Sequence, residues 1–370
     1  MKDFKYADEY ISEKDIMIAV PSVVIAIGIL QLPRSIAEET VAADGWLSIL
    51  AGGIMAMLIV WVVAKLASRF PGQSFLEYAS SLITKPAAII LLFLFVIQSI
   101  LLSAYEVRAI AGTAHRYLFE ETPVEVVALS FLLIVIYAVA GSRAGIFRLN
   151  ALFLPIVFFL SFILILFSIG FIDIDNLLPV FQTDMRGYVQ ATREGVLSYT
   201  GIGILFFYIA FVRNPRTVAQ KAVYGLSKAV LLYIFLFITC IAVFGNVSTA
   251  NITYPTVELS KAVEIPGGFF ERFEALFFVI WIMAIFNTTV MAFDIGLLLL
   301  KQLFPNVRKE RFVIVLSPFV FYISTIPRNY NELDLFGTIM SHYGLLLTVA
   351  AALILWIAAK FKGVKQGEKN

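Results

Sequence analysis

Two clusters of glycine and hydroxyl side chains interrupt long apolar runs of this sequence, about half a chain apart. The first run, IMIAVPSVVIAIGILQLPRSIAEET, contains Gly28 between two prolines, and the second, EGVLSYTGIGILFFYIAFV, contains Gly201. Proline removes a helical hydrogen bond, and glycine lowers the cost of unwinding. Unwound backbone at membrane depth is tolerated only where it lines a cavity or is buried in protein. We therefore interpret both runs as membrane helices that are broken near Gly28 and Gly201.

Two such breaks would present the chemical groups that bind a zwitterion. A half-helix that starts at a break offers free N–H groups and a positive dipole end, which favour a carboxylate. The exposed carbonyl groups favour an ammonium group or a cation, so an amino acid satisfies both. The alternative is that the small residues only allow close helix packing. The candidate ligand-binding residues at the breaks are Gly28, Ile29, Gln31, Ser198, Tyr199, Thr200 and Gly201.

Polar side chains inside two other apolar runs extend this candidate site. Gln98 and Tyr105 lie in the third run, and Asn287 and Thr288 lie in the eighth. They could orient the ligand, with Tyr105 as an aromatic gate. The competing explanations are ordinary ones, because a membrane threonine commonly bonds its own helix backbone and an aromatic ring commonly marks the membrane interface.

Ionisable groups are few inside the apolar runs. An intramembrane charge is by default a functional hypothesis. Glu106, Arg108 and Asp294 lie within a few residues of a predicted interface, however, so surface exposure or salt bridges to a partner remain open. No acidic residue directly adjoins either break. His115 and His342 lie in different halves and fit no metal spacing, so we predict no metal, no cofactor and no enzymatic activity.

Composition places the whole chain in a membrane. Of its 370 residues, 60% are hydrophobic and 15% are charged. Soluble domains are less apolar and carry about 25% charged residues. This excludes a soluble enzyme, a disordered protein and a secreted disulfide scaffold. The net charge of +2 is too small to indicate a nucleic-acid partner.

Apolar runs of spanning length predict an all-α membrane protein with ten transmembrane helices. Lys and Arg are concentrated in alternate connections, which places the N- and C-termini in the cytoplasm. Because five is odd, a second half of five spans enters the membrane from the opposite side. We expect one domain, residues 1–370, with inverted halves at about 14–180 and 185–360. The spans lie near 15–41, 46–68, 86–111, 124–141, 149–171, 189–211, 221–245, 270–300, 312–327 and 335–359.

The first broken run resembles a known transporter motif. Gly28-Ile29-Leu30-Gln31-Leu32-Pro33 is similar to the Gly-Ile-Phe-x-x-Pro stretch of amino-acid/polyamine/organocation (APC) transporters. Ala26 stands where that motif usually has a second glycine. The resemblance implies the five-plus-five inverted repeat of the LeuT-like fold, with broken first and sixth helices.

A set of ordered motifs along nearly the full length of the chain carries a second resemblance. The set includes Asp44-Gly45-Trp46, Arg69-Phe70-Pro71-Gly72, Asn176-Leu177-Leu178-Pro179-Val180 and Glu271-Arg272-Phe273-Glu274-Ala275. With these motifs the chain resembles an endospore germination permease, the B subunit of nutrient germinant receptors. The resemblance implies A and C subunits as partners, a location in the spore inner membrane, and recognition of a small nutrient, often an amino acid.

Three functions fit these observations. The first is a germinant sensor on a transporter fold, which passes a conformational shift to its partner subunits. The second is an ion-coupled secondary amino-acid transporter. The third is a membrane scaffold with a vestigial pocket. The three functions differ in ligand binding and in net uptake of the ligand, and the sequence is compatible with all three.

Overall fold

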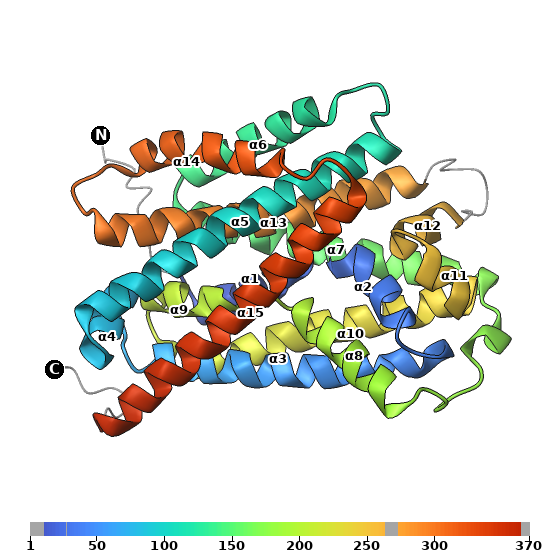
Figure 1. Cartoon of the computed structure of the whole chain (residues 1–370), viewed down its shortest axis with the longest axis horizontal. Coiled ribbons are helices and arrows are strands. Elements are labelled where there is room, and N and C mark those ends of the chain that lie inside the picture. Colours follow the sequence, from blue (N-terminus) through green and yellow to red (C-terminus); the bar gives the residue numbers. More distant parts are fainter. Residues whose placement is uncertain (1–10, 27, 263–272, 364–370) are drawn as a thin grey trace.

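The computed structural model describes residues 11–26, 28–262 and 273–363, and the regular elements within these ranges are helices. Figure 1 shows long helices that run roughly along the longest axis, with α3 near one side of the bundle and α6 and α14 near the other. The principal helices are α1 (Glu13–Val24), α2 (Gly28–Ala37), α3 (Gly45–Ala67), α4 (Phe75–Leu82), α5 (Lys85–Tyr117), α6 (Val124–Ala140), α7 (Arg143–Ser168), α8 (Met185–Leu197), α9 (Leu205–Tyr208), α10 (Val218–Phe244), α11 (Asn246–Asn251), α12 (Pro255–Ala262), α13 (Phe273–Leu303), α14 (Lys309–Ser324) and α15 (Tyr330–Phe361).

The chain is a multi-pass membrane protein by helix length and composition. Among the described residues, six helices are long and apolar enough to cross a bilayer, and eight are if each bent helix pair is one span. The remaining two predicted spans correspond to the 17-residue α6 and the 16-residue α14. Ten spans therefore remain a prediction. Residues 271 and 272 of the motif before α13 lie outside the described ranges.

The first predicted break separates α1 from α2, with a bend of 55°. The carbonyl groups that lose their helical partners there receive hydrogen bonds from side chains of other helices. Tyr233 Oη of α10 donates to the Val24 carbonyl at 2.7 Å, and Thr288 Oγ1 of α13 donates to the Ser22 carbonyl at 3.0 Å. Pro21 and Pro33 lie inside the two half-helices, so the prolines flank the break and do not form it.

The second break separates α8 from the short helical segment Ile202–Phe211, with a bend of 43°. Gly201 adopts φ +111°, a backbone conformation that side chains with a Cβ rarely adopt. The two breaks also approach each other closely, because a Cβ on Gly201 would lie 2.6 Å from Cγ1 of Val23. Thr200 Oγ1 donates to the Leu197 carbonyl at 2.6 Å, which satisfies one carbonyl that the break releases.

The carboxylate of Asp44 holds the connection that leads into α8. Asp44, at the end of a short 3-10 turn before α3, accepts hydrogen bonds from the backbone N–H groups of Gln182 at 2.8 Å and Thr183 at 2.9 Å. Asn176 donates to the Ala242 carbonyl at 3.1 Å, so α10 holds the same connection. Two motifs that are far apart in sequence, around Asp44 and Asn176, therefore act together to position the first half of the second broken helix.

The hydroxyl of Tyr233 is expected to stabilise the first break. Replacing Tyr233 with Phe removes one of two hydrogen bonds to the buried Val24 carbonyl and leaves the bond from the Ala26 N–H at 3.0 Å, so it should cost about 0.5–1.5 kcal/mol of unfolding free energy. The measurement is the thermal unfolding midpoint of the purified protein in detergent.

Tyr224 on the same helix provides the matched control, because its side chain is 56% exposed. Tyr224→Phe should leave the midpoint unchanged. Equal midpoints for Tyr233→Phe and the unmodified protein would show that the break does not depend on this bond.

Candidate functional site

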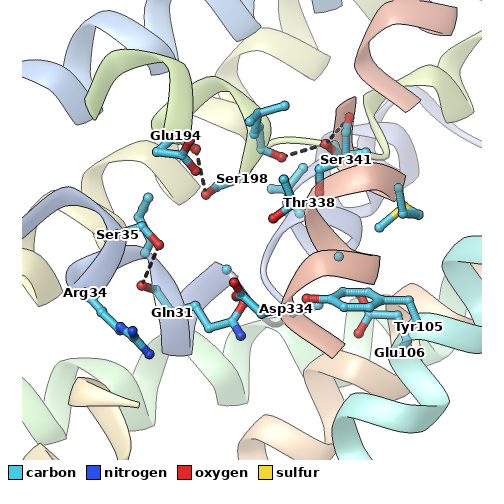
Figure 2. Close-up of a pocket in the computed structure, with 18 of the residues that line it drawn as sticks. Gln31, Arg34, Ser35, Tyr105, Glu106, Glu194, Ser198, Asp334, Thr338 and Ser341 are labelled. Carbon is cyan, nitrogen blue, oxygen red and sulfur yellow. Dashed lines mark hydrogen bonds between the residues drawn. The ribbon is translucent and has the colours of Figure 1, made fainter. Parts of the chain in front are cut away.

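A cavity of about 300 Å³ opens at the two helix breaks. Its walls come from the break regions themselves and from α2, α5, α8 and α15, and it reaches from Gly28 to Tyr330 at the first turn of α15. Figure 2 shows Gln31 and Arg34 of α2 on one side, Tyr105 and Glu106 of α5 on another, and Asp334 of α15 between them. Small-molecule sites typically start at about this volume and combine apolar walls with a few placed polar groups.

Several residues predicted from the sequence line this cavity. Gly28 and Gln31 contribute from the start of α2, and Ser198 and Thr200 contribute from the second break. Their convergence follows from the close approach of the two breaks. The other predicted residues that line the cavity are Tyr105 and Thr288.

The hydroxyl of Thr288 is already engaged by the protein. It donates to the carbonyl groups of Ser22 at 3.0 Å and Val23 at 3.2 Å. These carbonyls belong to the end of α1, so Thr288 holds the first break against α13. The structure thus gives this residue a positioning role at the wall of the cavity.

Three of the predicted residues lie away from the cavity. Ile29 is buried, and its carbonyl accepts a hydrogen bond from Thr256 Oγ1 at 2.7 Å. Tyr199 packs its ring on Tyr233, with ring centroids 5.7 Å apart, and Asn287 is buried in α13. Neither Tyr199 nor Asn287 lines the cavity, so a ligand contact by these three residues remains a prediction.

Gln98 and Gly201 line a second, much smaller cavity of about 30 Å³, which shares Val23 and Leu102 with the main cavity. Gln98 is buried, and its amide packs on α15, where a Cβ at Gly344 would lie 2.5 Å from Gln98 Nε2. The volume is enough for about one water molecule. The sequence grouped these residues with the main site, whereas the structure places them in the smaller cavity.

The lining of the main cavity is acidic. Five carboxylate residues and one guanidinium contribute to it: Glu38, Glu39, Glu106, Glu194, Asp334 and Arg34. Arg34 pairs with Glu38, with Arg34 Nε 2.8 Å from Glu38 Oε1, and also donates to Tyr330 Oη at 3.2 Å. The expectation that no acid adjoins the breaks holds only along the sequence. In space, Glu106 of α5 and Glu194 of α8 share the cavity with them.

Glu106 differs from the other acids in its burial. Its side chain is 3% exposed, and Glu106 Oε2 has no hydrogen-bond partner among the described residues. Because Glu106 lies near the end of the third predicted span, the sequence was also compatible with a side chain at the membrane surface or in a salt bridge to a partner. The structure places it instead in the wall of the cavity, next to Tyr105 (Figure 2).

Tyr105 forms part of the wall between α5 and α15. Its ring packs against Gly337, where a Cβ would lie 2.7 Å from the ring, and edge-on against Phe336 at 5.9 Å between centroids. This contact requires a residue without a side chain at position 337. Tyr105 is therefore a fixed part of the cavity wall in this conformation.

Aromatic rings pack together where α4 and α5 contact α9, and two of them, Phe95 and Phe207, also line the smaller cavity. Phe75 of α4 and Phe95 of α5 contact Phe206 and Phe207 of α9, with ring centroids between 5.0 and 5.9 Å apart. Tyr78 donates its hydroxyl to the Phe206 carbonyl at 2.9 Å. These contacts join α4 and α5 to the second half of the broken helix.

A buried ionic cluster lies on the same side as these rings. Asp294 of α13 is fully buried and accepts from Arg143 Nε at 2.8 Å and from Tyr208 Oη at 3.1 Å. Lys309 Nζ lies 3.5 Å from the same carboxylate. The cluster joins the starts of α7 and α14 to α13 and α9. Asp294, for which an interfacial role was open, is thus an internal structural anchor.

The sequence did not indicate most of the polar residues that line the cavity. Their signal was weak, because they belong to the polar ends of the predicted spans, where charge is expected at an interface. One available indication of the site was that acidic and hydroxyl side chains recur one helical turn apart before a break, as Glu194 and Ser198 do. The residues found only in the structure are Ser35, Glu38, Glu39, Glu194, Tyr330, Asp334, Thr338 and Ser341.

Sequence comparison identifies the family. The profile described as "Spore germination protein" matches residues 10–333 of the chain. The chain belongs to this spore germination protein family. It is 40% identical to spore germination protein GerLB of Bacillus cereus, over all of both chains. It is 30% identical to spore germination protein YndE of Bacillus subtilis (strain 168), over 95% of this chain and 96% of that one.

Structural comparison identifies the fold of this spore germination protein as that of LeuT-like transporters. MhsT, solved in complex with L-phenylalanine, superposes with a TM-score of 0.72 at 16% identity, covering 94% of this chain and 88% of MhsT. Mhp1, a nucleobase-cation-symport-1 family transporter, superposes with a TM-score of 0.70 at 14% identity, covering 95% and 78%. The all-α, LeuT-like fold predicted from the sequence is confirmed.

A side chain at Gly201 is expected to disrupt the site. Gly201→Val places a side chain on a backbone with positive φ and against Val23. It should therefore lower the unfolding free energy by about 1–3 kcal/mol and abolish any thermal stabilisation by L-amino acids. Gly112→Val is the control, because no atom lies within 4 Å of a Cβ there. An unchanged thermal response in Gly201→Val would remove the second break from the binding site.

The buried carboxylate of Asp294 is expected to hold α13 to α7 and α14. Asp294→Asn removes the buried negative charge that Arg143 and Lys309 face, and it should lower the unfolding free energy by about 3–5 kcal/mol. Glu310→Gln removes an exposed carboxylate that pairs with Arg308 at 3.4 Å, and it should change stability by less than about 0.5 kcal/mol. Similar unfolding midpoints for the two variants would contradict the anchoring role.

Proposed function

We propose that this chain is the germinant-sensing B subunit of a spore nutrient receptor and that it binds a small nutrient, an amino acid, at the broken helices. The single observation that carries the proposal is the cavity of about 300 Å³ at both breaks, in a member of the spore germination protein family. Its size suits one small molecule.

The chemistry of the cavity supports an amino acid as the ligand. Gly28 starts α2 within the lining, so backbone N–H groups of its first turn are available for a carboxylate. The acidic side chains of the wall suit a positively charged nitrogen. MhsT, which shares the fold, was solved with L-phenylalanine, and this supports an amino-acid site in the same architecture.

Sensing requires only a ligand-dependent shift between two conformations. A nutrient changes that equilibrium by its difference in affinity for the two states. In this proposal the ligand joins α2 and α8 to α5 and α15, and the resulting shift passes to A and C subunits in the spore inner membrane. Both termini lie in the cytoplasm in this arrangement, as the distribution of Lys and Arg favours. One transporter-like domain with inverted halves, about 14–180 and 185–360, provides the moving parts.

The alternative function is ion-coupled amino-acid transport. The observation that favours it is the fold, because both superposed structures share this architecture and Mhp1 is a cation-symport family transporter. A transporter must expose the site to each side of the membrane in turn, which requires contacts such as those of Asp294 and the phenylalanine rings to change. A sensor has no such requirement, and catalysis plays no part in either function.

The two functions differ in binding and net uptake. We expect the chain, purified with its A and C subunits, to be stabilised against heat by at least one of the twenty L-amino acids. The isolated chain in proteoliposomes should show no sustained, ion-dependent uptake of that amino acid. Uptake would establish the transporter, and the absence of both binding and uptake would leave the scaffold function.

A further inference from the structure

We propose that the carboxylate of Glu106 is the counter-ion for a positively charged nitrogen of the ligand, so that the nutrient of this cavity is an amine-bearing compound. This inference rests on the proposed binding function and adds to it a specificity-determining residue and a chemical class. It excludes neutral sugars and nucleosides, which the sequence left open.

The argument begins with the burial of Glu106. Its side chain is 3% exposed in the middle of the wall formed by α5, between Leu102 and the outer turns of that helix. An ionised carboxylate is costly to bury without a partner, and buried charges in proteins are normally paired. In membrane proteins such a group normally faces a cavity and marks the path or site of a ligand.

The second step is that no side chain in the described part of the chain pairs with this carboxylate. Glu106 Oε2 has no hydrogen-bond partner among the described residues. Arg34, the cation of the cavity lining, is already paired with Glu38 and bonded to Tyr330. Arg108, two residues further along α5, does not line the cavity. The fold therefore contains an acceptor in the cavity wall that the described side chains do not satisfy.

The third step concerns what lies opposite Glu106. The cavity that it faces also contains Gly28 and Ser198, one from each break. The first turn of α2 offers N–H groups to a carboxylate, and Glu106 offers a carboxylate to an ammonium group. Both ends of a zwitterion are then matched by groups of opposite charge. A ligand without the amine would leave Glu106 buried and unpaired, which provides discrimination.

The surrounding charge supports a cationic group over a free carboxylate at this position. Glu194 and Asp334 line the same cavity, and neither forms an ion pair among the described residues. Their field favours entry of a positive charge and disfavours a ligand that carries only negative charge. A bare metal ion is a poor fit, because the described residues contain no group of three or more His, Cys, Asp or Glu that would hold one.

The test compares Glu106→Gln with the unmodified full chain in detergent, by thermal shift and by isothermal titration. The probes are the twenty L-amino acids, with L-alanine, L-valine, L-leucine and L-phenylalanine each tested beside the 2-hydroxy acid in which a hydroxyl replaces the amine. The amine alone is tested with isobutylamine, and neutral ligands are tested with D-glucose and inosine.

We expect Glu106→Gln to raise the Kd of the bound amino acid by about tenfold to a hundredfold, because a hydrogen bond between charged groups is lost. The matching hydroxy acid should bind the unmodified chain weakly and with the same Kd in both proteins. Glu106→Asp keeps the charge but moves it one methylene group away from the ligand, so it should raise the Kd by less than Glu106→Gln does. Glu125→Gln, an exposed acid at the start of α6, should bind like the unmodified chain.

Equal amino-acid affinity in the unmodified chain and Glu106→Gln would overturn the inference and leave the proposed function intact. Binding of glucose or inosine in place of the amines would also overturn it. Binding of isobutylamine but of no amino acid would support the counter-ion role of Glu106 and overturn the amino-acid part of the proposed function. If no probe binds the unmodified chain, both proposals fail.

Discussion

The structure depends on how a membrane protein satisfies backbone groups where a helix is interrupted. In a bilayer, unpaired N–H and C=O groups cost several kcal/mol each, so an interruption persists only if other parts of the protein supply partners. Here Tyr233 of α10, Thr256 of α12 and Thr288 of α13 each donate a hydroxyl to a carbonyl near the first break. These three bonds connect the first broken helix to distant segments of the second half of the chain.

The same bonds explain why the cavity lies where it does. A helix that ends at Val24 and restarts at Gly28 leaves room at its centre, and the second break lies so close that a Cβ at Gly201 would clash with the side chain of Val23. Side chains from α5 and α15 then complete the wall. The polar groups not used to hold the breaks, Glu106 above all, remain available to a ligand.

Two sets of buried contacts join helices from different parts of the chain. Phenylalanine rings of α4, α5 and α9 pack edge-on against one another, and the buried Asp294 cluster joins α13 to α7 and α14. Contacts of this kind must change if the protein alternates between two conformations.

Local pattern was sufficient for the helices and the positions of their breaks. Length and hydropathy predicted the helical regions, since a spanning helix must bury about twenty apolar residues. Glycine and hydroxyl clusters predicted the breaks near Gly28 and Gly201, because backbone conformation there depends on local residue type. The inverted orientation of the halves was predicted from five spans in each, and the LeuT-like fold was implied by the resemblance of the first broken helix to APC transporters.

The membership of the site was decided by tertiary structure. Glu106, Glu194 and Asp334 belong to three different helices, and along the sequence each looks like a charge near a membrane interface. Only the packing of α5, α8 and α15 around the breaks brings these acids into one cavity. Conversely, Ile29, Tyr199 and Asn287 lie at or near the breaks or in a flanking helix but face the protein interior. Sequence determined which backbone could open, because that is a local property, whereas side-chain direction around the opening depends on helix rotation and crossing, which only long-range packing sets.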